Sequence, residues 1–167
     1  MPAVLFVCSA NRFRSMIAEV FFKRLLQEKH VNGRWTVTSA GTWAKEELPP
    51  LPAARKYAHS KGLDLEGMHS KEVNRDLLKR SDLVIVMTQG HQEALRIEFP
   101  EMASRIILLS DVSLRQIYDV HDPVEDPSNS LEEVGDEICS LVESGFDRIC
   151  RKAIQGEMDR QAAESSS

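Results

Sequence analysis

Apolar runs and stretches of helical periodicity alternate along most of the chain. Four stretches predict strands, three of them nearly continuous apolar runs and the fourth alternating: residues 4–8, 82–87, 106–109 and 34–39. Five stretches predict helices: residues 15–29, 52–61, 74–79, 90–99 and 131–154. Alternating strands and helices are typical of the α/β class. We therefore expect an open, parallel four-stranded sheet with helices on both faces.

The chain is long enough for one complete core, and no linker divides it. We expect residues 1–155 to form a single domain. Residues 156–167 are small and polar, so we expect a flexible C-terminal tail. Residues 111–129 form a long acidic stretch with prolines, and a loop of that length in a compact domain is often functional.

Composition and charge exclude several classes of protein. The formal net charge of −5 argues against general nucleic-acid binding. No apolar run approaches the length of a membrane span, and the N-terminal stretch lacks a basic leader. Three cysteines make no disulfide framework, and nothing resembles a zinc site. We expect a cytoplasmic monomer or weak dimer with no nucleic-acid or membrane partner.

The most informative stretch joins the first predicted strand to the first predicted helix. Cys8 ends the strand, Arg14 follows six positions later, and the helix begins at Ser15. Such a loop presents backbone N–H groups to an anion, and the helix N-terminus adds positive potential. The planar fork of Arg14 can bind two phosphate oxygens. The same potential favours a thiolate, so the stretch predicts a phosphate-binding loop with a cysteine nucleophile whose sulfur Ser15 can hydrogen-bond.

Simpler interpretations of these residues also exist. A lone cysteine at a strand end is usually a small core residue, and the Cys8 to Arg14 spacing alone is a weak signal. A nucleotide-binding loop is disfavoured because neither glycine-rich phosphate motif is present. The wider pattern is far more specific: Val7-Cys8-x-x-Asn11-x-x-Arg14-Ser15-x-Ile17-Ala18-Glu19.

This pattern resembles the signature loop of the low-molecular-weight protein tyrosine phosphatase family. The resemblance continues, in the family's order, through residues 38–42, 69–70, 82–87 and 122–123. It implies a phosphomonoesterase with a phosphocysteine intermediate and no metal or cofactor. Its substrate would be a phosphorylated protein or small phosphoester, and its product inorganic phosphate. By resemblance the phosphate-binding residues are Ser9, Ala10, Asn11, Arg12, Phe13, Arg14 and Ser15.

The resemblance also implies residues that support the loop and line the pocket. Asn11, Ser15, Ser39 and His69 are expected to form a hydrogen-bond network that holds the loop. From the residues alone, the favoured interpretation is that Ser39 is a turn residue and His69 a loop histidine. Trp43 and Val124 are expected at the rim of the substrate pocket. Val124 follows an Asp-Pro pair where the family often carries an aromatic residue.

Cleavage of a phosphate ester needs a proton for the leaving oxygen. By resemblance, the acid belongs to an Asp-Pro pair in the acidic loop, and this chain has two such pairs, at Asp122 and Asp126. Asp126 lies close to the start of the last predicted helix, so we expect it to shape a turn with Ser128. Asp122 lies in mid-loop and can reach the phosphate pocket. We therefore expect Asp122 to be the general acid and base.

Other functions remain open on the sequence. A phosphoarginine phosphatase would use the same loop. Arsenate reductases of related fold that depend on thioredoxin need further cysteines near mid-chain, and none lies between Cys8 and Cys139. A different class is a catalytically silent phosphate-binding regulatory module. The sequence does not name the physiological substrate.

Overall fold

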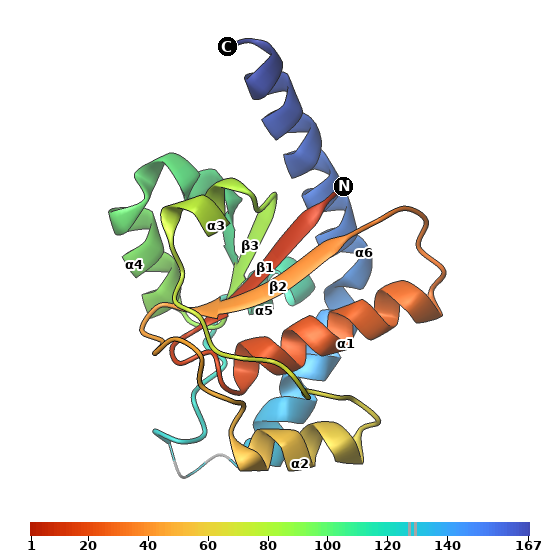
Figure 1. The fold of residues 1–167 in the computed structure, drawn as a ribbon, viewed down its shortest axis with the longest axis vertical. Helices are drawn as coiled ribbons and strands as arrows, with labels where there is room; N and C mark the ends of the chain where they lie inside the picture. The colour runs from red at the N-terminus through yellow and green to blue at the C-terminus, as the bar shows by residue number, and fades with distance from the viewer. Residues whose placement is uncertain (127, 129) are drawn as a thin grey trace.

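Four parallel strands form the expected sheet, in the order β2-β1-β3-β4 (Figure 1). The computed structural model describes residues 1–126, 128 and 130–167. The strands are β1 (Ala3–Cys8), β2 (Thr36–Gly41), β3 (Leu83–Val86) and β4 (Ile106–Leu108). The predicted fold class is confirmed.

Helices cover both faces of the sheet (Figure 1). On one face lie α1 (Arg14–Glu28), α2 (Pro52–Ser60), α5 (Leu109–Leu114) and α6 (Leu131–Ser165). On the other lie α3 (Arg75–Lys79), α4 (Gln89–Glu98) and the 3₁₀ helix η1 (Pro100–Arg105). Because side chains alternate along a strand, Val4 and Phe6 of β1 join the first core, whereas Leu5 and Val7 join the second. β1 is therefore buried on both faces.

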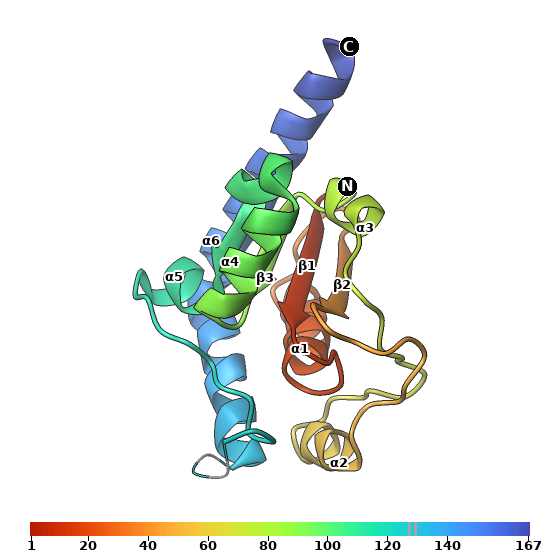
Figure 2. The same cartoon turned by 90° about the vertical axis from the view of Figure 1, so that its left-hand side faces the viewer.

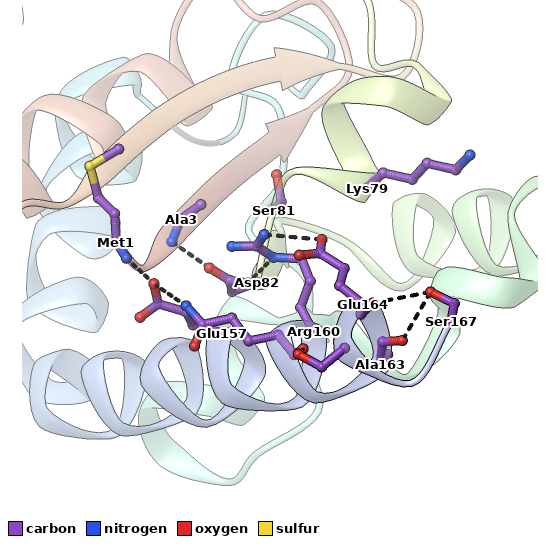
Figure 3. A network of polar contacts seen from close by, with 12 residues as sticks. Met1, Ala3, Lys79, Ser81, Asp82, Glu157, Arg160, Ala163, Glu164 and Ser167 are labelled. Carbon is purple, nitrogen blue, oxygen red and sulfur yellow. Dashed lines mark hydrogen bonds and ion pairs between the residues drawn. The ribbon is translucent and has the colours of Figure 1, made fainter.

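The expected flexible tail at residues 156–167 is instead helical, because α6 continues to Ser165 and projects beyond the other elements (Figure 2). The backbone of Asp82 packs closely against this part of α6, since a Cβ added at Gly156 would lie 2.4 Å from the Asp82 carbonyl oxygen. The side chain of Asp82 is fully buried, and its Oδ1 accepts a hydrogen bond of 2.8 Å from Arg160 Nε. Its Oδ2 accepts from the backbone N–H of Ala3 (Figure 3). The ion pair of Arg160 with the buried Asp82 carboxylate holds this part of the helix in place. The small, polar residues of the tail give no sign of this contact in the sequence.

The acidic loop is also shorter than expected. Its first residues belong to α5, which buries Leu109 and Val112 in the first core. In the segment between α5 and α6, Val120 is fully buried. Its backbone N–H donates to the carbonyl of Met87, which follows β3. This contact carries the segment across the carboxyl edge of the sheet.

The strand register places the functional residues at that edge. Cys8, the last residue of β1, lies beside Gly41 at the end of β2. Val7 pairs with Val86, the last residue of β3. In open α/β sheets, ligands bind beyond the carboxyl ends of the strands. In the described part of the chain, no helix is long and apolar enough to cross a membrane.

Candidate active site

The loop between β1 and α1 is held by its carbonyl groups. The carbonyls of Cys8, Ser9 and Arg12 accept hydrogen bonds from the backbone N–H groups of residues 42, 43 and 51 respectively. In a trans peptide the N–H points away from the C=O, so the following N–H groups point to the opposite side. None of the backbone N–H groups of residues 9–13 donates to an acceptor among the described residues. The loop therefore offers an anion a set of unpaired donors.

The start of α1 adds to this positive potential. Its N-cap residue is Phe13, and no side chain caps the helix. The first N–H groups of an uncapped helix are unpaired, and the helix dipole places partial positive charge there. Loop and helix together match the donor set that phosphate groups require.

The candidate nucleophile Cys8 is buried, and its Sγ lies 3.0 Å from Ser15 Oγ. Asn11 Nδ2 donates to the same Ser15 Oγ at 2.8 Å. Because this hydroxyl already accepts from Asn11, its own hydrogen is available to the sulfur. Ser15 can thus donate to a thiolate and stabilise it.

Asn11 joins the loop to its neighbours. It adopts a left-handed conformation with φ of 55°, which asparagine tolerates better than most residues. Besides Ser15, its Nδ2 donates to Ser39 Oγ at 3.0 Å, and its Oδ1 accepts from Lys71 N at 3.0 Å. The structure thus brings together Asn11, Ser15 and Ser39, as expected. It does not bring in His69, whose side chain is exposed and makes no hydrogen bond within the described residues.

Glu19 completes this network, a role that the sequence reasoning missed. Ser39 Oγ donates to Glu19 Oε2 at 2.6 Å, and Lys23 Nζ lies 2.7 Å from Oε1. Glu19 is buried on α1 among apolar neighbours. The sequence did contain a signal for this role: Glu19 lies on the apolar side of an amphipathic helix, and a buried carboxylate needs hydrogen-bond partners.

Arg14 is buried, and its guanidinium is fixed by neighbouring oxygens. Nη1 donates to the carbonyl of Val120 at 2.8 Å, and Nη2 lies 3.4 Å from Ser9 Oγ. Nη2 is also 3.6 Å from Asp122 Oδ2, a pair close enough for charge attraction. The other guanidinium N–H groups have no acceptor within the described residues and can bind an oxyanion.

Asp122 shares a small cavity with the cysteine and the arginine. The cavity has a volume of about 200 Å³ and is lined by Cys8, Ala10, Arg12, Phe13, Arg14, Leu51, Asp122 and Val124. Asp126 does not line it, and its Oδ1 instead accepts from Ser128 N in a turn. Of the two Asp-Pro carboxylates, Asp122 lies at the cavity with Cys8 and Arg14, and Asp126 does not.

The two expected rim residues have different positions. Val124 is exposed and lines the cavity. Trp43 is 89% exposed and does not line it, and only its backbone contacts the loop, through a hydrogen bond to Ser9 O. Arg12 occupies the rim instead, with its Nε donating to Pro49 O at 2.8 Å.

His91 is a further residue that the sequence reasoning missed. It lies in the first turn of α4, is nearly buried, and places Nε2 2.8 Å from Ser9 Oγ. Burial, together with the charge of Arg14, lowers the pKa of His91 to about 4, so its ring is neutral near pH 7. The sequence signal that could have found it is Thr88, a helix cap two residues after the end of β3 and three residues before His91.

Comparison with known proteins identifies the family. A sequence model of the family described as "Low molecular weight phosphotyrosine protein phosphatase" matches residues 3–157. The chain belongs to this family. The resemblance drawn from the sequence is thereby confirmed, and the chain is a hydrolase of the low molecular weight protein-tyrosine-phosphatase type.

Individual family members are related at moderate identity. The chain is 31% identical to the low molecular weight protein-tyrosine-phosphatase Wzb of Escherichia coli K12 over 140 residues, which cover 84% of this chain and 87% of Wzb. It is 27% identical to a protein-arginine-phosphatase of Bacillus subtilis over 139 residues, covering 83% and 91%. The crystal structure of YfkJ from B. subtilis superposes with a TM-score of 0.82 at 29% identity, covering 91% of this chain and 96% of YfkJ.

Among the described residues, no group of three or more histidine, cysteine, aspartate or glutamate side chains could hold a metal ion. The positive charge near the cavity comes from Arg14 and the loop itself.

Gly41 allows β2 to approach the phosphatase loop closely. A Cβ added at Gly41 would lie 2.3 Å from the carbonyl oxygen of Ser9. Gly41 N donates to Lys71 O, and its carbonyl accepts from Val73 N, so its backbone is fixed on the other side as well. A larger residue can be accommodated only if the loop moves.

Gly41→Ala is therefore expected to displace the loop and lower kcat/KM by about 100-fold, the order of loss that a misplacement of about 1 Å can cause. Steady-state kinetics with p-nitrophenyl phosphate measure this loss. Gly90→Ala is the matched control, because its Cβ would meet only Thr88 Oγ1, at 3.6 Å. A Gly41→Ala enzyme as active as the control would contradict this account of the loop.

Proposed function

We propose that this enzyme hydrolyses phosphate monoesters through a phosphocysteine intermediate, with Cys8 as nucleophile and Asp122 as general acid and base. The observation that carries the proposal is the shared cavity of Cys8, Arg14 and Asp122 beside the unpaired N–H groups of the loop. Nucleophile, oxyanion donors and proton donor are thus within reach of one phosphoryl group.

In the first step, the Cys8 thiolate attacks phosphorus and the bond to the ester oxygen breaks. The loop N–H groups and Arg14 stabilise the negative charge on the remaining phosphoryl oxygens. Asp122 gives its proton to the leaving oxygen, so an alcohol or phenol departs rather than its anion.

In the second step, water attacks the phosphocysteine. The Asp122 carboxylate takes a proton from the water, and the bond between sulfur and phosphorus breaks. Ser15 donates to the departing sulfur, which makes the thiolate a better leaving group. Inorganic phosphate leaves, and the free enzyme is regenerated without a metal or cofactor.

The rim supports a phosphotyrosine-bearing protein as the substrate. Leu51 and Val124 offer apolar surface to an aromatic ring. The relatives include protein-tyrosine-phosphatases and a protein-arginine-phosphatase, so both substrates suit the scaffold. Arg12 at the rim favours the first, because a phosphoarginine guanidinium would meet a second cation there.

We further place this activity in the cytoplasm. Cys8, Cys139 and Cys150 are all free thiols, which supports a reducing compartment.

Cys8→Ser is expected to abolish turnover of p-nitrophenyl phosphate while vanadate still binds, because the oxyanion donors are retained and the thiolate is lost. Cys150→Ser, on α6, is the control and should keep wild-type activity. Near-normal kcat in Cys8→Ser would refute the phosphocysteine route. Absence of turnover in the wild-type protein, with vanadate bound, would instead indicate a silent phosphate-binding module.

Asp122→Ala should slow hydrolysis of phenyl phosphate by about 100-fold or more, because a basic leaving group needs the proton. p-Nitrophenyl phosphate should be affected far less, and the alkaline limb of the pH profile should flatten. Asp126→Ala is the matched control and should change stability more than leaving-group dependence. Leaving-group sensitivity that appears only in Asp126→Ala would move the acid to the second Asp-Pro pair.

Arg12→Gln should raise kcat/KM for a phosphoarginine peptide relative to a phosphotyrosine peptide by about fivefold, which corresponds to about 1 kcal/mol of charge repulsion. Parallel assays on the two peptides measure the ratio. Arg34→Gln, an exposed change just before β2, is the control. An unchanged ratio would show that Arg12 does not select the substrate.

A further inference from the structure

A partly buried pair of polar side chains at the loop takes no part in the two chemical steps. Ser9 follows the nucleophile directly, and its Oγ lies 2.8 Å from His91 Nε2. The same oxygen lies 3.4 Å from Arg14 Nη2 and accepts from it. His91 is thus linked through one hydroxyl to the arginine that binds phosphate.

The other ring nitrogen of His91 has no partner. Nδ1 is buried and makes no hydrogen bond within the described residues. An unpaired polar atom in a buried position costs about 1–3 kcal/mol and is uncommon without a function. Helix packing alone does not explain the choice of histidine here, because Thr88 already caps α4.

The charges around His91 make it sensitive to an anion in the loop. Arg14 faces it from α1, and Asp119 and Asp122 face it from the segment between α5 and α6. Burial is the largest cause of its low pKa, the charge of Arg14 is the second, and the two carboxylates act in the opposite direction. A dianion bound at Arg14 offsets the arginine charge and adds negative charge, so it raises the pKa of His91.

Protonation also fixes the direction of the hydrogen bond. A charged imidazole carries hydrogen on both nitrogens, so Nε2 must donate to Ser9 Oγ. Ser9 then accepts from both His91 and Arg14, and its own hydrogen turns to another acceptor. The neutral ring permits either direction.

We propose that His91 is a positioning residue that fixes Arg14 through Ser9 and takes up a proton when a phosphoryl dianion occupies the loop. This inference rests on the proposed function of the loop. It adds a linkage in which phosphate binding and protonation of His91 strengthen each other. A dianion that does not titrate in this range is accordingly held more tightly as the pH falls through the window between the free and the bound pKa of His91.

The linkage is tested on the Cys8→Ser protein with sulfate, a dianion that does not titrate in the relevant range, so that neither the thiol nor the ligand changes charge. NMR follows the ring signals of the five histidines against pH with and without saturating sulfate, and His91→Gln assigns the His91 signal. Sulfate is expected to raise the pKa of His91 from about 4 by about one unit or more. Sulfate affinity should then rise by up to about tenfold as the pH falls through that window, because one unit corresponds to a factor of ten.

Two outcomes of this experiment are decisive. A His91 signal that titrates identically with and without sulfate overturns this inference but not the proposed function. Failure of sulfate to bind to Cys8→Ser overturns both. His59→Gln in Cys8→Ser is the control, since His59 is exposed on α2, and should leave the linkage unchanged.

The positioning role is tested by kinetics in the otherwise wild-type enzyme. His91→Ala and Ser9→Ala should each lower kcat/KM by about tenfold, and the double variant should lose little more, because both break one chain of contacts. His91→Gln can still donate to Ser9 and should recover most of the activity. Additive losses, or a His91→Gln enzyme as impaired as His91→Ala, would contradict the role assigned to His91.

Discussion

The site depends on keeping the N–H groups of residues 9–13 unpaired within the protein. Such groups destabilise a folded chain unless water or a ligand binds them. The conformation persists because three loop carbonyls are hydrogen-bonded from outside, by residues 42, 43 and 51. The side chain of Asn11 holds the loop through hydrogen bonds to Ser39 and Lys71, and its backbone adopts a left-handed conformation that asparagine tolerates. In the proposed function, a bound phosphoryl group accepts hydrogen bonds from these N–H groups and so supplies the partners that the protein itself does not.

The opposite charges of Arg14 and Asp122 are both positioned by one segment of the chain. Arg14 is held by the carbonyl of Val120, and Asp122, the proposed general acid, follows two residues later. One segment between α5 and α6 therefore fixes the cation and delivers the carboxylate. The backbone N–H of Val120 donates to the carbonyl of Met87, the residue after β3. The position of Asp122 is therefore fixed relative to the sheet and not left to a free loop.

The order of strands and helices and the fold class could be predicted from the sequence, because apolar runs and helical spacing reflect which residues are buried. The cysteine loop was also predictable, since a strand end, a helix start and an arginine lie within a few residues. Contacts between distant segments could not be predicted from the residues alone, and the contact of Asn11 with Ser39 was expected only from the family resemblance. Glu19 and His91 have roles only because Ser39 and Ser9 approach them in space. The helical end of α6 escaped prediction for the same reason, since its partner Asp82 lies far away in the sequence.

Phe13 gives the loop one further property. Its side chain is buried in the first core and meets the ring of Tyr57 edge-on, with centroids 6.2 Å apart. Phe13 therefore packs the start of α1 against α2. No second cysteine lies between Cys8 and Ser15. Oxidation of Cys8 to a sulfenic acid finds no resolving cysteine within the loop to convert it into a disulfide. With Phe13 in this position, we expect a sulfenic acid formed at Cys8 to be oxidised further to the sulfinic acid, a step that is irreversible for most proteins.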